Sequence, residues 1–331
     1  MNNLYEKSLF KLIIILSIMM VLTSVTFALD STYIIRAGCL DAIGSEANIC
    51  LDKFKELVEA KTNNRITVKV FPAEQLGGAM EESDALRMGS QEILLDEPAA
   101  FDSIYPPASI FGMLYIFRDQ EHLHSVLDGA VGKKFIDDMA KKVNIRFIGY
   151  YDRLPRHLTS NKPIRSVDDV KNLIIRVPNT EAFVKGWKAL GAKPTPMNWG
   201  EVYTSLATGL VEAQENPFTS IWDAKLFEVQ KYLNLTGHSL SVYALAMNDS
   251  FLNKLPKDLQ EAVIDAAKET GIYMNVKVKQ IGLEQEAKLK EKMEFINTDV
   301  SSFKNRLIEA EIWKEFKDID ETLYNEIINT K

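Results

Sequence analysis

An arginine and an asparagine stand near the ends of two short apolar segments in the middle of the chain. Residues 173–179 (LIIRVPN) and 209–217 (GLVEAQENP) are each typical of a buried strand that leads into the start of a helix. In open α/β sheets, ligands sit in the crevice outside the carboxyl ends of the strands. Arg176 and Asn216 are therefore the first candidates for a ligand-binding site.

Arg176 lies on an otherwise apolar strand, and a buried guanidinium is costly unless an anion meets it. Arg156, in the segment 154–157 (LPRH), could supply a second guanidinium, and two arginines can hold one carboxylate through charge-assisted hydrogen bonds. These residue types favour the binding of an organic acid. A salt bridge from Arg176 to an internal carboxylate is the alternative.

The elements that must position these residues form two series of alternating strands and helices. The first series has strands at 33–39, 66–71 and 92–95, with helices at 45–61 and 79–88. The second series has strands at 156–159, 173–179 and 209–217, with helices after Ser166 and over 180–190 and 199–208. This alternation predicts an α/β protein with two lobes, each a mixed sheet flanked by helices.

An unusually long helical pattern runs from residue 257 to about 295. A helix of that length extends for roughly 60 Å at about 1.5 Å per residue, so we expect it to span both lobes. Two helices joined at Gly271 or Gly282 are the alternative. The expected division is lobe I over 29–153, with 242–281 returning to it, and lobe II over 154–241, with C-terminal helices from 282 to 331 packing on it.

The amino terminus has the layout of a secretory signal. Lys7 and Lys11 precede an apolar run over residues 12–28, which ends in the small-residue site Thr-Phe-Ala at 26–28. We therefore expect export and cleavage near Ala28, and an uncleaved membrane anchor is the alternative. The segment 37–39 (AGC) resembles a lipid attachment site, but its distance from the apolar run argues against that use.

Charge and composition exclude several classes of function. Loss of residues 1–28 changes the formal charge from −7 to −8, so the exported chain is acidic and a poor candidate for nucleic-acid binding. With two cysteines, Cys39 and Cys50, the chain is no disulfide scaffold, and both a single bridge and two buried thiols remain open. His122 and His124 stand two apart, a spacing that points them away from each other on a helix.

No sequence motif indicates catalysis. The chain contains no glycine-rich phosphate loop, no His-Glu-x-x-His helix and no Gly-x-Ser-x-Gly elbow. Its carboxylates are scattered among lysines, as on solvated helix faces. The sequence therefore predicts a binding protein with no cofactor, no metal and no enzymatic activity.

Short segments in a fixed order resemble the substrate-binding proteins of tripartite ATP-independent periplasmic (TRAP) transporters, in the group that binds dicarboxylates and sialic acid. The resemblance covers essentially the whole mature chain. Its densest part comprises residues 175–179 (IRVPN), 190–192 (LGA), 194–197 (PTPM), 201–203 (EVY), 214–217 (QENP), 227–232 (FEVQKY) and 236–238 (TGH), and it also includes 71–72 (FP), 75–77 (QLG) and 161–164 (NKPI).

The resemblance implies a two-lobed periplasmic-binding-protein fold that closes on an organic acid. It also implies delivery of that acid to membrane subunits of a permease driven by a sodium gradient. The protein would act as a monomer in the periplasm. A ligand-sensing adaptor with the same fold is a rival from another class.

The family pattern assigns roles to individual residues. By likeness, Arg176 would pair with the ligand carboxylate and Arg156 would assist it. Asn216 would hydrogen-bond the carboxylate or a neighbouring hydroxyl, while Asn179 and His238 would line the same cleft. His238 could equally be a neutral structural hydrogen-bonding group.

Two further residues match family positions in contact with ligand. Trp199 stands where the family places an aromatic side chain against the ligand, and a place in the core at a helix start is its alternative role. Glu97, in the segment 96–98 (DEP), matches a carboxylate that receives ligand hydroxyls in sialic-acid binders. A charge at a strand end with no contact to ligand is its alternative role.

Departures from the family pattern bear on the ligand. Leu40, Ala79 and Ala100 stand where the sialic-acid binders have polar contacts, and each buried polar group left without a partner costs about 1–3 kcal/mol. The segment 156–159 (RHLT) and Trp187 look more like members that bind hexuronates or aldonates. We therefore expect a sugar acid, with a C4-dicarboxylate or sialic acid as the alternatives.

Overall fold

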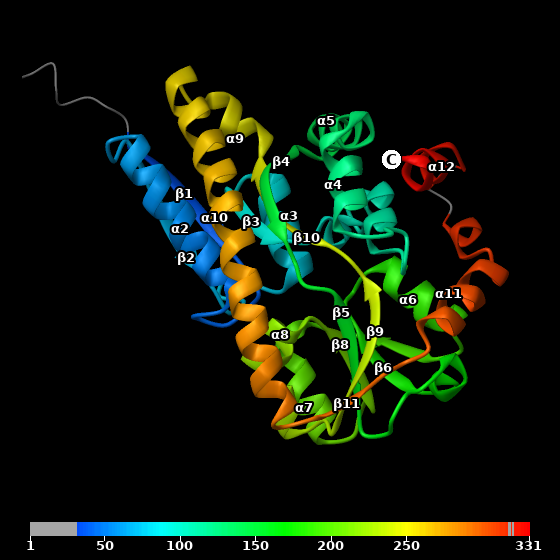
Figure 1. Cartoon of the computed structure of the whole chain (residues 1–331). Coiled ribbons are helices and arrows are strands. Elements are labelled where there is room, and N and C mark those ends of the chain that lie inside the picture. Colours follow the sequence, from blue (N-terminus) through cyan, green and yellow to red (C-terminus); the bar gives the residue numbers. More distant parts are fainter. Residues whose placement is uncertain (1–31, 317–318, 320) are drawn as a thin grey trace, which may run out of the picture.

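The computed structural model describes residues 32–316, 319 and 321–331. The expected signal peptide, residues 1–28, lies outside the described residues. Two sheets with flanking helices form two lobes, one above the other in the view of Figure 1.

Lobe I is built on a five-stranded sheet. Its strand order is β2(Ile66–Phe71), β1(Tyr33–Gly38), β3(Ile93–Asp96), β10(Val242–Asn248), β4(Ile145–Asp152). β1 runs parallel to β2 and β3, whereas β10 runs antiparallel to β3 and β4. The helices of this lobe are α2(Glu46–Lys61), α3(Ala79–Met88), α4(Gln120–Asp128), α5(Ala130–Val143) and α9(Asp249–Lys254), with short 3-10 helices η1(Pro98–Phe101) and η2(Pro106–Gly112).

Lobe II is built on a six-stranded sheet. Its strand order is β11(Glu294–Ile296), β9(Tyr232–Ser239), β5(Arg156–Ser160), β8(Ala213–Asn216), β6(Ile174–Val177), β7(Lys193–Pro196). β6 runs parallel to β7 and β8, whereas β5 runs antiparallel to β8 and β9. The remaining elements before the C-terminal region are α6(Glu181–Ala189), α7(Val202–Ala207), α8(Phe218–Asp223), η3(Val167–Val170), η4(Trp199–Glu201) and η5(Leu226–Glu228).

Local signals in lobe II begin and end elements where the sequence predicts. The side chains of Ser166 and Asp169 form a reciprocal capping box, although the element that they start is the single 3-10 turn η3 rather than a longer helix. Gly209 has φ of 75°, which is the left-handed conformation expected of a glycine that ends a helix.

Two of the crossings between the lobes are short segments that connect strands of the two sheets. Residues 153–155 connect β4 to β5, and residues 240–241 return the chain from β9 to β10. These crossings lie beside the cavity described below, so residues near them are placed at the boundary between the lobes.

The long helix α10(Lys257–Lys290) is continuous and contacts both lobes. It packs against α2 and β4 in lobe I and against α8 in lobe II. Two glycines permit this close passage, because a Cβ atom on Gly271 would lie 2.3 Å from the carbonyl oxygen of Tyr150, and one on Gly282 would lie 2.3 Å from Cδ1 of Leu154. The glycines therefore serve close packing and do not divide the helix.

The C-terminal helices separate between the lobes, which corrects the expectation that everything after residue 282 packs on lobe II. α11(Val300–Glu309) places Phe303 and Leu307 in the core of lobe II. The short helix η6(Ile312–Glu315) then leads back, and α12(Glu321–Asn329) packs against α5 in lobe I (Figure 1). The amphipathic pattern gives the buried face of a helix but not the partner that covers it.

Both cysteines lie in the core of lobe I as free, buried thiols. Cys39 follows β1, which is paired on both sides by β2 and β3. Cleavage before Cys39, as lipid attachment requires, would remove β1 from the sheet.

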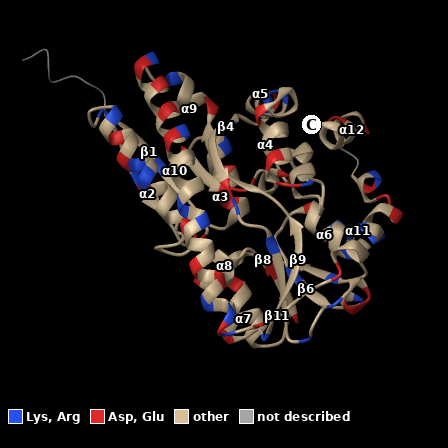
Figure 2. Cartoon of the chain, in the orientation of Figure 1, with Lys and Arg blue, Asp and Glu red and all other residues tan. Residues whose placement is uncertain are grey.

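Charged residues of both signs are interspersed on the outer faces of the helices, as Figure 2 shows along α2 and α10. Over the described ranges, no helix combines the length and the apolar character needed to span a membrane.

Candidate functional site

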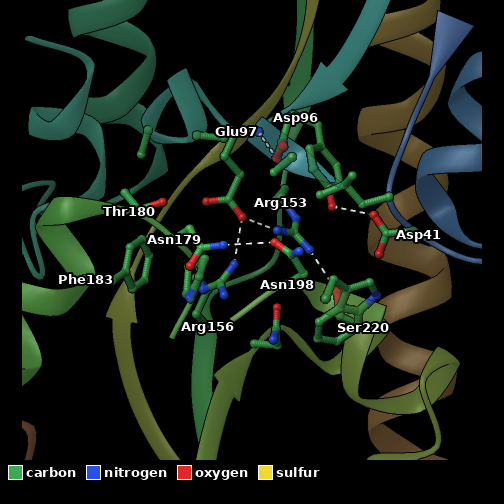
Figure 3. A pocket seen from close by; sticks show the side chains of 18 of the residues that line it. Asp41, Asp96, Glu97, Arg153, Arg156, Asn179, Thr180, Phe183, Asn198 and Ser220 are labelled. Carbon is green, nitrogen blue, oxygen red and sulfur yellow. Dashed lines mark hydrogen bonds and ion pairs between the residues drawn. The ribbon is translucent and has the colours of Figure 1, made fainter. Parts of the chain in front are cut away.

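A cavity lies between the two lobes and is lined by side chains from both (Figure 3). Lobe I contributes Leu40, Asp41, Ala79, Met80, Leu95, Asp96, Glu97, Ala99, Ala100 and Tyr243. Lobe II and the first crossing contribute Arg153, Arg156, Arg176, Pro178, Asn179, Thr180, Phe183, Met197, Asn198, Trp199, Asn216 and Ser220.

Two hydrogen bonds join the lobes next to residues that line this cavity. The backbone N–H of Gly200 donates to Oε1 of Glu74 at 3.2 Å. The backbone N–H of Glu181, at the start of α6, donates to Oδ2 of Asp102 at 2.6 Å. The cavity is therefore bounded by lobes that already touch.

Arg176 reaches the cavity from the C-terminal end of β6 and is buried, with 4% of its surface exposed. Its Nε–H and one Nη2–H donate to the carbonyl oxygen of Met197, at 3.2 and 2.8 Å. A guanidinium carries five N–H donors, so three remain. Within the described part of the chain, Arg176 forms no ion pair with a carboxylate, and Trp199 lies 5.5 Å from its Cζ.

Burial lowers the pKa of Arg176 to about 10, although Glu215 pulls in the opposite direction. The side chain remains cationic at neutral pH, because that pH lies well below 10. A buried cation without a protein counter-ion favours an anion that arrives from outside.

Arg156, the second predicted arginine, lines the cavity but is bonded to protein carboxylates. Its Nε and Nη2 bind Oε2 and Oε1 of Glu215 at 2.6 and 2.8 Å, and Nη2 also donates to the backbone oxygen of Glu215 at 3.0 Å. Its Nη1 binds Oε1 of Glu97 at 2.7 Å. Four of its five N–H groups are thus used, which leaves one for a ligand.

Glu97 lines the cavity and bridges two arginines rather than standing alone (Figure 3). Its Oε1 is shared by Arg156 and by Nη1 of Arg153. Burial alone would raise the pKa of Glu97, but Arg156 and Arg153 together lower it below its ordinary value.

Arg153 was missed by sequence reasoning. It lies in the first crossing, with Cζ 4.1 Å above the ring of Tyr243, and its Nη2 donates to Ser220 in α8 at 2.8 Å. Its Nε lies 3.5 Å from Oε1 of Glu46. The signal that could have found it is its position three residues before Arg156, in the segment that joins the lobes.

His238 lies behind the cavity wall, with no exposed surface. Its Nε2 contacts Oε2 of Glu215 at 2.8 Å, and its Nδ1 contacts the hydroxyl of Thr236 at 2.8 Å. Burial lowers the pKa of His238 although Glu215 opposes this, so the ring is neutral at pH 7. The structure thus places His238 where it orients Glu215, and not on the cavity wall.

Glu215 is fully buried, and its carboxylate contacts both Arg156 and His238. Burial would raise the pKa of its carboxyl, but Arg156 and His238 lower that pKa to about 2. We name Arg156, Glu215, Glu97 and Arg153 the paired cluster.

Three amide side chains line the same cavity as Arg176. Asn216, at the end of β8, is 4% exposed and donates from Nδ2 to Oε1 of Gln214 at 2.7 Å. Asn179 donates from Nδ2 to Oδ1 of Asn198 at 2.9 Å. All three cavity-lining amides, Asn216, Asn179 and Asn198, come from lobe II.

The wall from lobe I carries two acidic residues that sequence reasoning missed. Asp41 follows β1, and its Oδ2 accepts a hydrogen bond from the hydroxyl of Tyr243 at 2.7 Å. Asp96 ends β3, and its Oδ1 accepts from the backbone N–H of Glu97 at 2.7 Å. The rule of strand ends that singled out Arg176 in lobe II would have found both.

Apolar side chains complete the wall. Leu40, Ala79 and Ala100, the three positions where the sequence departs from the sialic-acid pattern, all line the cavity. Phe183 and Trp199 add aromatic surface from lobe II.

In the described ranges, no group of three or more His, Cys, Asp or Glu side chains has the arrangement of a metal site. The two histidines of α4 have separate partners. His122 contacts the backbone oxygen of Ile327 at 2.9 Å, and His124 contacts Oδ1 of Asp152 at 2.5 Å.

Comparison with known proteins gives one family. Residues 44–319 match the family model described as bacterial extracellular solute-binding protein, family 7. A solute-binding protein of Roseobacter denitrificans is 32% identical over 92% of this chain and 94% of its own length. Its crystal structure with bound L-galactonate superposes with a TM-score of 0.82, covering 89% of this chain and 99% of that one.

Two other relatives differ in their named ligands. The 2,3-diketo-L-gulonate-binding periplasmic protein of Escherichia coli is 31% identical over 72% of this chain and 73% of its own length. The C4-dicarboxylate-binding periplasmic protein of Rhodobacter capsulatus is 33% identical over 67% of both chains.

Proposed function

The chain belongs to family 7 of the bacterial extracellular solute-binding proteins, and we propose that it captures a sugar acid, such as an aldonate or a hexuronate, through an arginine–carboxylate clamp. Members of this family are binding components of transport systems and not enzymes. The proposal assigns no chemical step to the site.

The state of Arg176 carries this proposal. The side chain is buried, faces the cavity, keeps three N–H donors and meets no carboxylate of the described chain. A carboxylate held by two parallel N–H bonds would restore the electrostatic energy that burial takes from the guanidinium.

Neighbouring groups can complete the clamp. Asn216 uses its Nδ2 within the protein and keeps its carbonyl oxygen for a ligand hydroxyl beside the carboxylate. Asn179 has donor capacity left on its amide, since one of its two N–H groups is used. Arg156 can add one N–H, so its main role is to hold the wall in place.

The rest of the ligand would lie against lobe I. Leu40, Ala79 and Ala100 supply no hydrogen bonds from their side chains, which disfavours the long polar substituents of sialic acid. The relatives that bind L-galactonate and 2,3-diketo-L-gulonate support a six-carbon sugar acid here. The C4-dicarboxylate-binding relative keeps a dicarboxylate as the second candidate.

Capture would serve uptake. We infer an exported, monomeric protein in the periplasm whose lobes close over the acid and present it to the membrane subunits of a TRAP permease. Contacts such as Glu74 with Gly200 and Asp102 with Glu181 would hold the closed form.

Calorimetric titration of residues 29–331 with L-galactonate and D-glucuronate tests the proposal. At least one acid should bind the wild type. Arg176→Ala should lower its affinity by about 2–5 kcal/mol, or roughly 30-fold or more, because the bound carboxylate then lacks its counter-ion. Arg165→Ala, which removes an exposed arginine from the same lobe, is the matched control.

Two results would contradict the proposal. One is an unchanged affinity in Arg176→Ala. The other is the absence of binding by any member of a wider panel of sugar acids in a thermal-shift screen, in which a ligand at 100 times its Kd stabilises the protein by about 2.7 kcal/mol.

A further inference from the structure

Charged side chains of both signs line the cavity, and those of the paired cluster neutralise one another. Arg153 and Arg156 are matched by Glu97 and Glu215 within the paired cluster. Arg176 then remains as a cation on the lobe II side.

Asp41 and Asp96 remain as acids on the lobe I side. Over the described residues, neither forms an ion pair with a lysine, arginine or histidine. The lobe II side of the cavity therefore presents a cation without an ion-pair partner, and the lobe I side presents two acidic residues without one.

The two aspartates are brought together by the sheet. β1 and β3 are adjacent parallel strands, so the residues that follow their carboxyl ends meet at one edge. Asp41 and Asp96 both line the cavity there, and 8% and 9% of their surfaces are exposed. A site for part of the ligand can form at this edge.

One carboxylate oxygen of Asp96 lacks a hydrogen-bond partner among the described residues. Its Oδ1 accepts the N–H of Glu97, but its Oδ2 is buried and has no partner among the described residues. A buried acceptor without a donor costs about 1–3 kcal/mol. A donor supplied by the ligand would remove that cost.

The chemistry of this wall is selective. An ionised carboxylate accepts hydrogen bonds and donates none. A hydroxyl group can satisfy it, whereas a second carboxylate on the ligand would bring like charges together in a site shielded from water, where charge interactions are strong.

We propose that Asp41 and Asp96 form an acidic subsite that receives the hydroxyl groups at the end of the ligand away from Arg176 and excludes a second carboxylate. This inference rests on the proposed function and narrows it. The ligand is a polyhydroxy monocarboxylate, and dicarboxylates of the same length are rejected.

The subsite complements the clamp. Arg176 binds the group that all organic acids share, so it cannot distinguish among them. Asp41 and Asp96 would contact the opposite end of the ligand, where monoacids and diacids differ. Selection against diacids is thus assigned to lobe I.

A matched pair of ligands tests the proposal by calorimetry at pH 9, which lies above the pKa of about 8 of Asp96, so that its carboxyl is ionised. Galactarate has the carbon chain of L-galactonate with the terminal CH2OH replaced by a carboxylate. We expect wild-type protein to bind L-galactonate at least 100-fold more tightly than galactarate. Equal binding of the two acids would overturn the subsite.

Variants then assign the selectivity to residues. Asp96→Asn and Asp41→Asn keep the side-chain shape and remove one charge each, so each should reduce the galactonate-to-galactarate ratio at least tenfold. Asp265→Asn, on the exposed face of α10, removes the same charge away from the cavity and should leave the ratio unchanged. Thermal unfolding of each unliganded variant verifies its fold.

The outcomes separate this inference from the proposed function. A wild-type ratio above 100 that neither cavity variant changes would overturn the role of Asp41 and Asp96 and leave Arg176 as the clamp. Failure of the wild type to bind either acid or any other sugar acid would overturn the proposed function, and the subsite with it.

Discussion

Arg156 on β5 and Arg176 on β6 belong to one sheet, line one cavity and are buried to the same extent, with 4% of each exposed. Their partners differ. Arg156 is tied to Glu215 and Glu97 by hydrogen bonds of 2.6–3.0 Å, whereas Arg176 touches a backbone carbonyl and keeps three N–H donors.

The difference separates two uses of a buried charge. The paired cluster around Glu215 fixes the geometry of the cavity wall, since each of its charges would be costly without the others. Arg176 from lobe II and Asp96 from lobe I keep hydrogen-bonding groups without a partner among the described residues. Groups that cost stability when the cavity is empty are the groups that can gain most from a ligand.

The same substitution at the two arginines should affect the stability of the unliganded protein differently. Arg156→Ala strands the fully buried carboxylate of Glu215 and should lower the free energy of unfolding by about 3–5 kcal/mol. Arg176→Ala removes a desolvated cation without a counter-ion and should leave that free energy unchanged or raise it. Urea unfolding without ligand measures both.

Comparable losses of stability in the two variants would remove the distinction between a paired and an unpaired arginine. Arg165→Ala, on the exposed surface of lobe II, serves as the reference for loss of an arginine as such.

Asp96 provides a corresponding test of an unpaired buried charge on the lobe I side of the cavity. Burial raises the pKa of Asp96 to about 8 from an ordinary value of 3.8. Because the folded protein disfavours the ionised form, wild-type stability should fall as pH rises from about 4 and level off above about 8. Asp96→Asn removes that titration.

The measurement is the change in unfolding free energy between pH 5 and pH 8. This change should be more negative in the wild type than in Asp96→Asn, by about 1–3 kcal/mol. Each protein is compared with itself at the two pH values. Any change in stability that the new amide causes at every pH therefore cancels. Identical pH profiles would show that Asp96 is not held as an unsatisfied buried acid.

The sequence alone predicted the architecture and two residues that line the cavity, for a physical reason. Strand ends in an α/β sheet project toward ligands, and this rule places Arg176 and Asn216 from local pattern only. The same rule applied to β1 and β3 would have identified Asp41 and Asp96, whose acidic side chains follow apolar strands. Both residues could therefore have been predicted from the sequence.

The paired cluster could not be read from the sequence in the same way. Arg156 meets Glu215 only because β5 lies antiparallel to β8, in a register that pairs Leu158 with Glu215. Neither residue carries a local signal of its partner, which stands 59 positions away. Whether a buried arginine is satisfied depends on such long-range pairing.

The C-terminal region shows a second kind of limit. The sequence predicts C-terminal helices that pack on lobe II, but α11 covers lobe II while α12 returns to lobe I and packs on α5. An amphipathic helix presents an apolar face of similar character to either lobe. The choice between lobes is set by the connecting segment and by which surface is left uncovered.

The smallest expected effect is a proton released on binding, and it distinguishes a ligand that satisfies Asp96 from one that does not. At pH 7, below the pKa of about 8, Asp96 in the empty cavity is mostly protonated. Nearby Glu97 and Asp41 favour that protonated form, while Arg153 opposes it. A ligand hydroxyl that donates to Asp96 stabilises the ionised form and lowers this pKa, so binding should release up to one proton.

Affinity for L-galactonate should therefore rise with pH and level off near pH 8. Titration at pH 7 in two buffers with different ionisation enthalpies measures the number of protons released, and Asp96→Asn should abolish the release. Release that persists in that variant would point instead to Glu46, whose pKa burial raises to about 7. No release from the wild type would mean that the ligand leaves Asp96 unsatisfied, and the acidic end would then lose its role in recognition.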